Sequence, residues 1–306
     1  MEDKEFNEKY EQLKKSKFKQ QKLWGWRPVP TISCITIIYI SFAVFFILFG
    51  ILILVFNGQI NEVKLNYNIC SNESNDPDGC PRDSCITTTI NKKMKKPIMI
   101  YYELDNFSQN HRAYLDSKSE KQLEGKEVSN KDLEKCDNIL LNKDIDNNPL
   151  DPNAPAIPCG LMAKSYFQDK FCRWEINGIK IKPRVENIAY KLDKDKYGKI
   201  KHENTHWIDM SDEHFMIWMR PSPFSNPRKL WGVIEDNLEK GDSLNIYIRN
   251  MNYYKYQKYI ILSTRNIFGG KSLFLGMCYI VFGILCLIAS ITFIIAFNSF
   301  HKKNSK

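Results

Sequence analysis

Two long apolar stretches lie near the ends of this 306-residue chain. Thr31–Phe56 and Leu273–Phe297 contain no Asp, Glu, Lys, Arg or His, and they are 26 and 25 residues long. Each is longer than the roughly 20 residues that a helix needs to cross a bilayer. We therefore predict five segments: a tail over residues 1–30, a transmembrane helix over 31–56, an ectodomain over 57–271, a transmembrane helix over 272–297 and a tail over 298–306.

The flanking charges predict the orientation, because Lys and Arg are retained on the cytoplasmic face. Residues 1–30 hold eight basic and five acidic side chains, and residues 298–306 add three lysines. Both tails are therefore expected in the cytoplasm, with the ectodomain on the lumenal or extracellular side. A cleavable signal peptide would have an apolar core of only about 7–15 residues. The first apolar stretch has 26 residues and is therefore too long to be one.

The ectodomain is nearly balanced in charge, so nucleic acid is not an expected partner.

The positions of the nine cysteines agree with this orientation. Cys34, Cys278 and Cys286 lie within the spans, and the other six lie in the ectodomain: Cys70, Cys80, Cys85, Cys136, Cys159 and Cys172. Disulfides persist in lumenal and extracellular compartments. Six cysteines allow 15 pairings, and the residues alone leave the choice open. Asn72 and Asn106 begin two acceptor sequences for N-glycosylation on the same side.

Short apolar runs predict a mainly β ectodomain, an antiparallel β-sandwich with short helical insertions. The expected strands are Ile98–Tyr102, Phe215–Met219, Leu244–Ile248 and Tyr259–Leu262. The expected helical pieces are Phe107–Leu115 and Ala163–Phe171, and the proline-rich Asp144–Pro158 is expected to be an extended loop.

One motif invites an enzyme assignment. His202–His206 fits the H-E-x-x-H pattern of zinc hydrolases, in which a helix places both imidazoles on one face. The surrounding sequence is charged and lacks the apolar periodicity of a buried helix, so we favour a solvated loop. No G-x-S-x-G or Walker-type motif is present. We therefore expect no catalytic residue, no metal and no cofactor.

Intramembrane ionisable residues usually mark a transport path. Neither span contains Asp, Glu, Lys, Arg or His, so we do not expect this chain to form a transport path alone. Small residues recur at intervals of seven: Ala43 and Gly50 in the first span, and Gly276, Gly283 and Ser290 in the second. Such positions let helix backbones approach closely. We expect Gly276 and Gly283 to contact another membrane protein.

Six ordered blocks resemble the cell division control protein 50 family, the β-subunits of type IV P-type ATPases, which are phospholipid flippases. The blocks are Gln20–Pro28, Tyr101–Tyr114, Pro158–Ser165, Asp212–Arg220, Arg228–Gly232 and Ile261–Gly276. The resemblance implies a non-catalytic accessory subunit that supports the folding, endoplasmic reticulum exit and activity of an ATPase. The implied cargo is aminophospholipid, moved to the cytoplasmic leaflet.

The resemblance also implies particular site residues. It pairs Cys136 with Cys159, whereas the other four cysteines depart from the spacing of the family. Cys70 with Cys85 and Cys80 with Cys172 is one option for them. In the tail, Trp24, Trp26, Arg27 and Pro28 are expected to contact the partner at the membrane interface, where indole rings favour the headgroup level.

The alternative from another class is a two-span ligand-gated channel or receptor subunit with a disulfide-rich ectodomain. For the family member, the expected home is the endoplasmic reticulum, the Golgi or endosomes, or the plasma membrane. The sequence identifies neither the ATPase nor the lipid.

Overall fold

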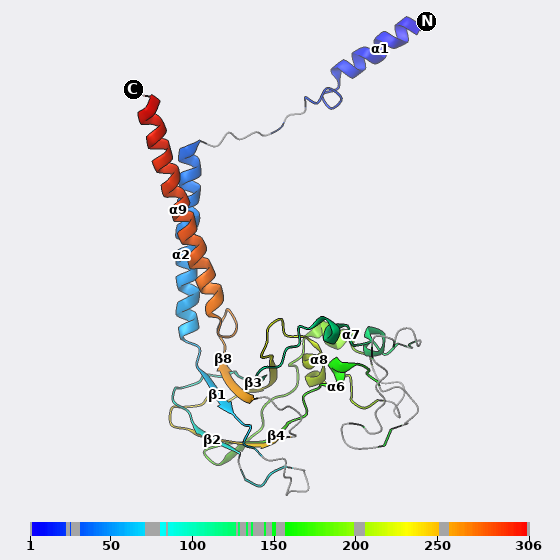
Figure 1. The fold of residues 1–306 in the computed structure, drawn as a ribbon, viewed down its shortest axis with the longest axis vertical. Helices are drawn as coiled ribbons and strands as arrows, with labels where there is room; N and C mark the ends of the chain where they lie inside the picture. Colours follow the sequence, from blue (N-terminus) through cyan, green and yellow to red (C-terminus); the bar gives the residue numbers. More distant parts are fainter. Residues whose placement is uncertain are drawn as a thin grey trace. The chain divides into compact units, whose positions relative to one another are not determined.

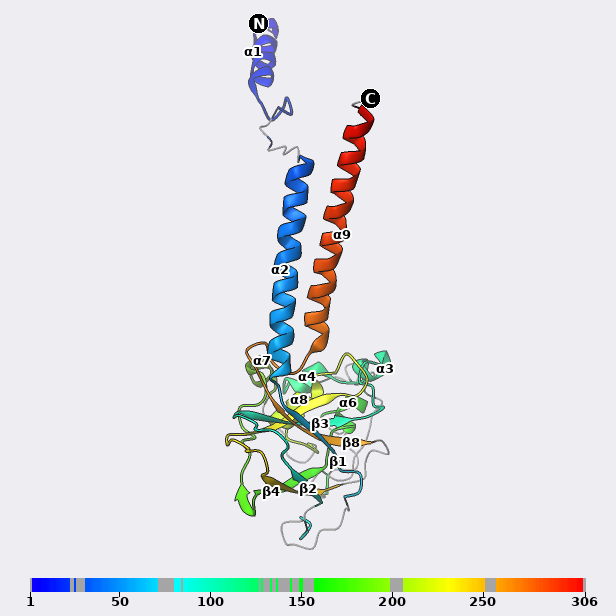
Figure 2. The same cartoon turned by 90° about the vertical axis from the view of Figure 1, so that its left-hand side faces the viewer.

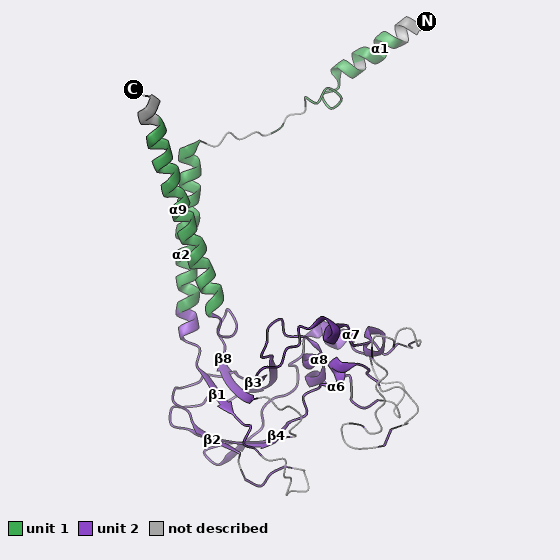
Figure 3. Cartoon of the chain, viewed as in Figure 1, with its two compact units in different colours: residues 1–54, 273–306 green, residues 55–272 purple. Residues whose placement is uncertain are grey.

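The computed structural model describes most of the chain. The described residues are 2–22, 25, 31–70, 80–83, 85–126, 128, 133, 136, 144, 149–150, 157–198, 206–250 and 257–304. They form two compact units, one of residues 1–54 with 273–306 and one of residues 55–272 (Figures 1 and 3). The second unit corresponds closely to the expected ectodomain.

The first unit contains α1 (Glu2–Lys15), most of α2 (Ile32–Gly58) and α9 (Leu273–Asn304). Both α2 and residues Leu273–Phe300 of α9 are long and apolar enough to cross a membrane, with mean hydropathies of 3.0 and 2.9. Figures 1 and 2 show α2 and α9 side by side. The two-span prediction is therefore confirmed.

The second unit is built on two four-stranded antiparallel sheets. The first sheet has the order β1-β8-β3-β6, with β1 (Glu62–Asn66), β8 (Lys258–Thr264), β3 (Ile98–Leu104) and β6 (Arg228–Ile234). The second has the order β2-β7-β4-β5, with β2 (Ile86–Thr89), β7 (Ser243–Arg249), β4 (Lys170–Ile176) and β5 (Ile179–Ile181). The predicted β-rich ectodomain is confirmed.

Register shifts occur at two positions in these sheets. Between β3 and β6, Ile100 pairs with Gly232 and Tyr101 with Leu230, so Trp231 is an extra residue. Between β4 and β7, Phe171 pairs with Ile248 and Arg173 with Tyr247, so Cys172 is extra. A bulge turns its side chain away from the strand's regular alternation. Trp231 and Cys172 are thereby freed to make contacts outside the ladder.

Short helices lie between the strands: α3 (Arg112–Asp116), α4 (Glu120–Leu123), α6 (Leu161–Lys164), α7 (Lys191–Lys196) and α8 (Glu213–Met219). Three of the four predicted strands are confirmed. The strand predicted over Phe215–Met219 is wrong, because these residues belong to α8. The predicted helix over Phe107–Leu115 is helical only from Arg112. That over Ala163–Phe171 is helical only to Lys164 and enters β4 at Lys170. Most of Asp144–Pro158 lies outside the described residues.

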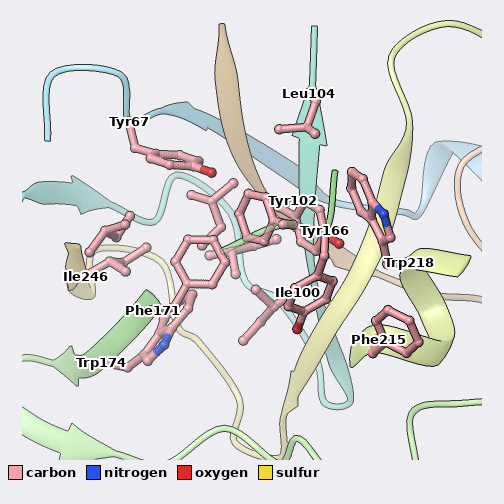
Figure 4. Close-up of a cluster of buried hydrophobic side chains, with 14 of the residues drawn as sticks. Tyr67, Ile100, Tyr102, Leu104, Tyr166, Phe171, Trp174, Phe215, Trp218 and Ile246 are labelled. Atoms are coloured by element: carbon pink, nitrogen blue, oxygen red, sulfur yellow. The ribbon is translucent and has the colours of Figure 1, made fainter. Parts of the chain in front are cut away.

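The core lies between the sheets and is rich in aromatic side chains (Figure 4). Trp231 of β6 packs against Phe171 and Trp174 of β4, with ring centroids 5.0 and 5.8 Å apart. Tyr102 of β3 stacks on Phe167 at 3.8 Å. The contacts of Trp231 join the two sheets into one body. Burying each large ring contributes about 1.5–3 kcal/mol.

Candidate functional site

Four of the blocks that carry the family resemblance meet around α8. Trp218 of α8 stacks on Phe107 at 5.8 Å and donates from Nε1 to the Met162 carbonyl at 2.8 Å. His214, also on α8, lies 2.8 Å through Nε2 from the Trp231 carbonyl. We call the assembly of residues 101–114, 158–165, 212–220 and 228–232 the block cluster. Its members are far apart in the sequence, so their contacts hold distant segments of the ectodomain together.

Two adjacent carboxylates organise the start of α8. Asp212 caps the helix by accepting from the His214 backbone N–H at 3.0 Å. Burial acts to raise the pKa of Asp212, but hydrogen bonds from His214 and Tyr166 outweigh it and lower that pKa. Because the cap removes an orphan N–H group, it stabilises a helix of only seven residues.

Glu213 binds the chain that precedes α7. Its carboxylate accepts from the backbone N–H groups of Asn187, Ile188 and Ala189 at 2.7–2.9 Å, and from Lys194 Nζ at 2.7 Å. Burial alone would raise the pKa of Glu213, yet these donors outweigh it and hold the pKa at about 2. The ionised carboxylate therefore fastens this loop to α8 at every physiological pH.

Two residues of β6 secure α8 from the other side. In the middle of the strand, the Trp231 carbonyl contacts His214, whose ring also lies beside Asp212; burial opposes the charge of His214, but the carboxylate raises its pKa. Near the start of the strand, Lys229 Nζ donates to the Arg220 carbonyl beyond the last turn of α8. Burial lowers the pKa of Lys229 to about 8. Polar contacts in the block cluster thus serve packing, and none forms a nucleophile with an adjacent base.

The backbone around Gly160, in the block Pro158–Ser165, leaves no room for a side chain at that position. Its φ is +99°, and a Cβ would lie 2.1 Å from the Ser117 carbonyl oxygen. The neighbouring Pro158 carbonyl accepts from Trp207 Nε1 at 2.8 Å. The turn into α6 therefore requires glycine both for its dihedral angle and for its close backbone approach.

Glycines also define the contact between the membrane helices. A Cβ on Gly283 would lie 2.6 Å from Ile47 Cγ1 and 3.2 Å from the Ala43 carbonyl oxygen. A Cβ on Gly50 would meet the backbone of Gly276 at 3.1 Å. The small residues of α2 thus face those of α9 in antiparallel order. Gly276 and Gly283 contact α2 of the same chain, and their contact with another protein stays a prediction.

The ectodomain is tied at the point where the helices reach it. Asn57 donates from Nδ2 to the Ser272 carbonyl, and the Ser272 N–H donates to Asn57 Oδ1 at 3.0 Å. Four residues further on, the Asn61 N–H donates to Thr264 Oγ1 at 3.0 Å. This reciprocal pairing holds the entry and exit of the ectodomain together.

Three disulfides close the ectodomain. Cys70 bonds to Cys85, Cys80 to Cys172 and Cys136 to Cys159, with Cα–Cα distances of 5.4, 6.0 and 5.5 Å. These are the pairs put forward from the sequence. Asn106 is exposed and has a φ of 54°, and its glycosylation stays a prediction.

Several residues named from the sequence lie outside the described residues. They are Trp24, Trp26, Arg27 and Pro28 of the tail, Asn72, and the H-E-x-x-H segment except His206. Within the described ranges, no group of three His, Cys, Asp or Glu side chains is placed to hold a metal ion.

A cavity of about 210 Å³ lies beside the block cluster. Its lining is mainly aromatic, with Asp169, Lys170 and His214 as the ionisable groups other than tyrosine. Asp169 is already paired, because it accepts from Lys258 Nζ at 2.7 Å and from Tyr67 Oη at 3.0 Å. Because Asp169 and His214 are both engaged inside the protein, we assign no ligand to this cavity.

Comparison with known proteins gives consistent results over nearly the whole chain. Residues 53–303 match the sequence model of the LEM3 (ligand-effect modulator 3) family / CDC50 family. ALA-interacting subunit 3 of Arabidopsis thaliana is 31% identical, covering 93% of this chain and 86% of the relative. Putative ALA-interacting subunit 2 of the same plant is 34% identical, over 94% and 88%. Cell cycle control protein 50A of Mus musculus is 27% identical, over 94% and 90%.

Proposed function

Because the chain belongs to the CDC50 family, we propose that it is the accessory subunit of a type IV P-type ATPase that moves phospholipid across a membrane. The observation that carries the proposal is the match over nine-tenths of the chain to relatives named interacting subunits. In this role the partner hydrolyses ATP, and the present chain supports its folding, its exit from the endoplasmic reticulum and its activity.

The proposed role uses three parts of the chain. In this proposal the tails are cytoplasmic, the two paired helices lie in the bilayer, and the disulfide-closed sandwich lies on the lumenal or extracellular side. The hydrogen bonds between Asn57 and Ser272 join the entry and the exit of the ectodomain unit. A partner that contacts the tail, the helices and the ectodomain is therefore bound at three places, and the other two contacts remain if one is lost. The five segment boundaries given above are part of this proposal.

The complex itself is testable by affinity purification. The full chain, tagged at its C-terminus and purified in mild detergent, is expected to bring down a type IV P-type ATPase in stoichiometric amount, identified by mass spectrometry. Recovery of the chain without any such ATPase would refute the proposal. Ligand-evoked current from the chain expressed alone would instead support the channel-subunit alternative.

The tail segment Trp24–Pro28 is proposed to anchor the subunit at the cytoplasmic membrane surface, in contact with the ATPase. Replacing Trp26 and Arg27 together by alanine is expected to reduce co-purification and surface delivery of the ATPase several-fold. Phe18→Ala is the matched control, because Phe18 is 75% exposed and lies outside the segment. Equal recovery from the double variant and the control would remove the tail from the interface.

A further inference from the structure

The turn that leads into α9 exposes two apolar side chains. Ile267 is 87% exposed and Phe268 is 42% exposed. Asn266 and Gly269 exchange backbone hydrogen bonds of 3.0 and 3.1 Å, and Asn266 Oδ1 accepts from the Phe268 N–H at 2.8 Å. We call Arg265–Lys271 the juxtamembrane turn. It is an ordered structure that presents Ile267 outward, so exposure of this side chain is built into the fold.

Contacts within the ectodomain unit determine the depth of this turn relative to the bilayer. The ring of Phe268 lies edge-on to the ring of Phe56, with centroids 5.6 Å apart. Phe56 is the last residue of the first apolar stretch, and the next residue, Asn57, is bonded to Ser272. The juxtamembrane turn therefore lies where the hydrocarbon of the bilayer gives way to the headgroups.

The composition of the turn fits that level. Phe268 and Ile267 are apolar, Arg265 and Lys271 flank them and are exposed, and the turn contains no acidic residue. Long basic side chains lay their stems along apolar surface and keep their charged ends in the polar layer. Phospholipid presents both surfaces at once, acyl chain and phosphate.

We propose that the juxtamembrane turn binds phospholipid of the non-cytoplasmic leaflet. Ile267 and Phe268 enter the upper acyl region, and Arg265 and Lys271 bind phosphate oxygens. The turn is continuous with a span that is already in lipid, and this continuity favours lipid over a protein partner. The ectodomain is thereby held at the bilayer surface by a contact additional to its two helices.

Site-specific photocrosslinking tests this assignment. The photoreactive amino acid p-benzoylphenylalanine is introduced at Ile267 in the full chain, expressed in cells and irradiated in native membranes. Adducts are then identified by mass spectrometry. Ile69 is the matched control: it is 85% exposed, but it follows β1 at the end away from α2, about 17 Å along the strand.

A phospholipid adduct at position 267 in at least fivefold excess over position 69 is the expected result. Phe268 provides a second probe position, since the reagent preserves a phenyl ring there. The double variant Arg265→Gln with Lys271→Gln is expected to lower the lipid adduct at least twofold. An adduct to another protein at position 267, or equal lipid yields at positions 267 and 69, would overturn the proposal.

Discussion

Replacing Glu213 by glutamine tests how the block cluster is held together. Glu213→Gln keeps the size of the side chain but removes the charge that three backbone N–H groups and Lys194 now share. An amide has one acceptor oxygen in place of two, and its NH₂ group would face N–H donors. The variant should therefore release the loop at residues 187–189 from α8.

The size of the effect follows from the pKa of Glu213, which is lowered from 4.5 to about 2. At 1.36 kcal/mol per pKa unit, this shift corresponds to about 3 kcal/mol of stabilisation in the ionised form. The side chain is 20% exposed, and allowing for solvent screening leaves about 2 kcal/mol. For a domain of this size, that lowers the melting temperature by about 4–8 °C.

The pH dependence has a definite sign. A carboxylate whose pKa is depressed on folding stabilises the protein fully above its unfolded pKa, and the contribution fades as pH falls towards the folded value. The deficit of Glu213→Gln should therefore be nearly the same at pH 7 and pH 5. It should shrink from about pH 4.5, where the unfolded chain begins to protonate Glu213, towards about pH 2, where the folded protein does.

Thermal melting of the full chain in detergent, followed by tryptophan fluorescence, measures this deficit. Glu235→Gln is the matched control, because Glu235 pairs with Arg184 at 3.0 Å on the surface and is 53% exposed. Exposed pairs contribute at most about 1 kcal/mol. A Glu213→Gln protein that melts within 1 °C (about the resolution of the assay) of Glu235→Gln would refute the reasoning, as would a deficit that disappears between pH 7 and pH 5.

Three further variants test other parts of the account. Gly160→Ala should cost at least about 2 kcal/mol, whereas Gly178→Ala, with φ of +79° and open space at its Cβ, should cost only about 1–2 kcal/mol in the same melts. The Cys80–Cys172 disulfide closes a 92-residue loop and the Cys70–Cys85 disulfide a 15-residue loop. Replacing Cys80 and Cys172 by serine should therefore lower the free energy of unfolding by about 1.6 kcal/mol more than replacing Cys70 and Cys85. Equal losses would contradict the chain-entropy argument. Asn106→Gln should abolish one glycosidase-sensitive step in gel mobility, and an unchanged pattern would show that this exposed site carries no glycan.

The spans, the sheets and the presence of disulfides could be predicted because each depends on local composition. The uninterrupted apolar stretches, the short β-branched runs and the even number of ectodomain cysteines require no knowledge of distant contacts. Phe215–Met219 was misassigned because a five-residue apolar run has no readable period and fits a buried strand or helix equally. Asp212 followed by Glu213 was the available signal for a helix start.

The block cluster and the helix pairing could not be predicted, because both depend on residues far apart in the chain. Glu213 gives no sign that its partners are the N–H groups of residues 187–189. The heptad spacing of Gly276 and Gly283 correctly indicates a close helix contact, but it does not identify the partner, which here is α2 of the same chain. Likewise, nothing in the local sequence indicates that Gly269 closes a hydrogen-bonded turn with Asn266.

The central claim is that this chain is a flippase accessory subunit, and lipid-stimulated ATP hydrolysis tests it most directly. A type IV P-type ATPase recovered with the chain is expressed with it and without it, purified, and assayed with aminophospholipid. The account predicts folded enzyme and lipid-stimulated hydrolysis only with the chain present. Full activity of the ATPase expressed and purified alone would contradict it.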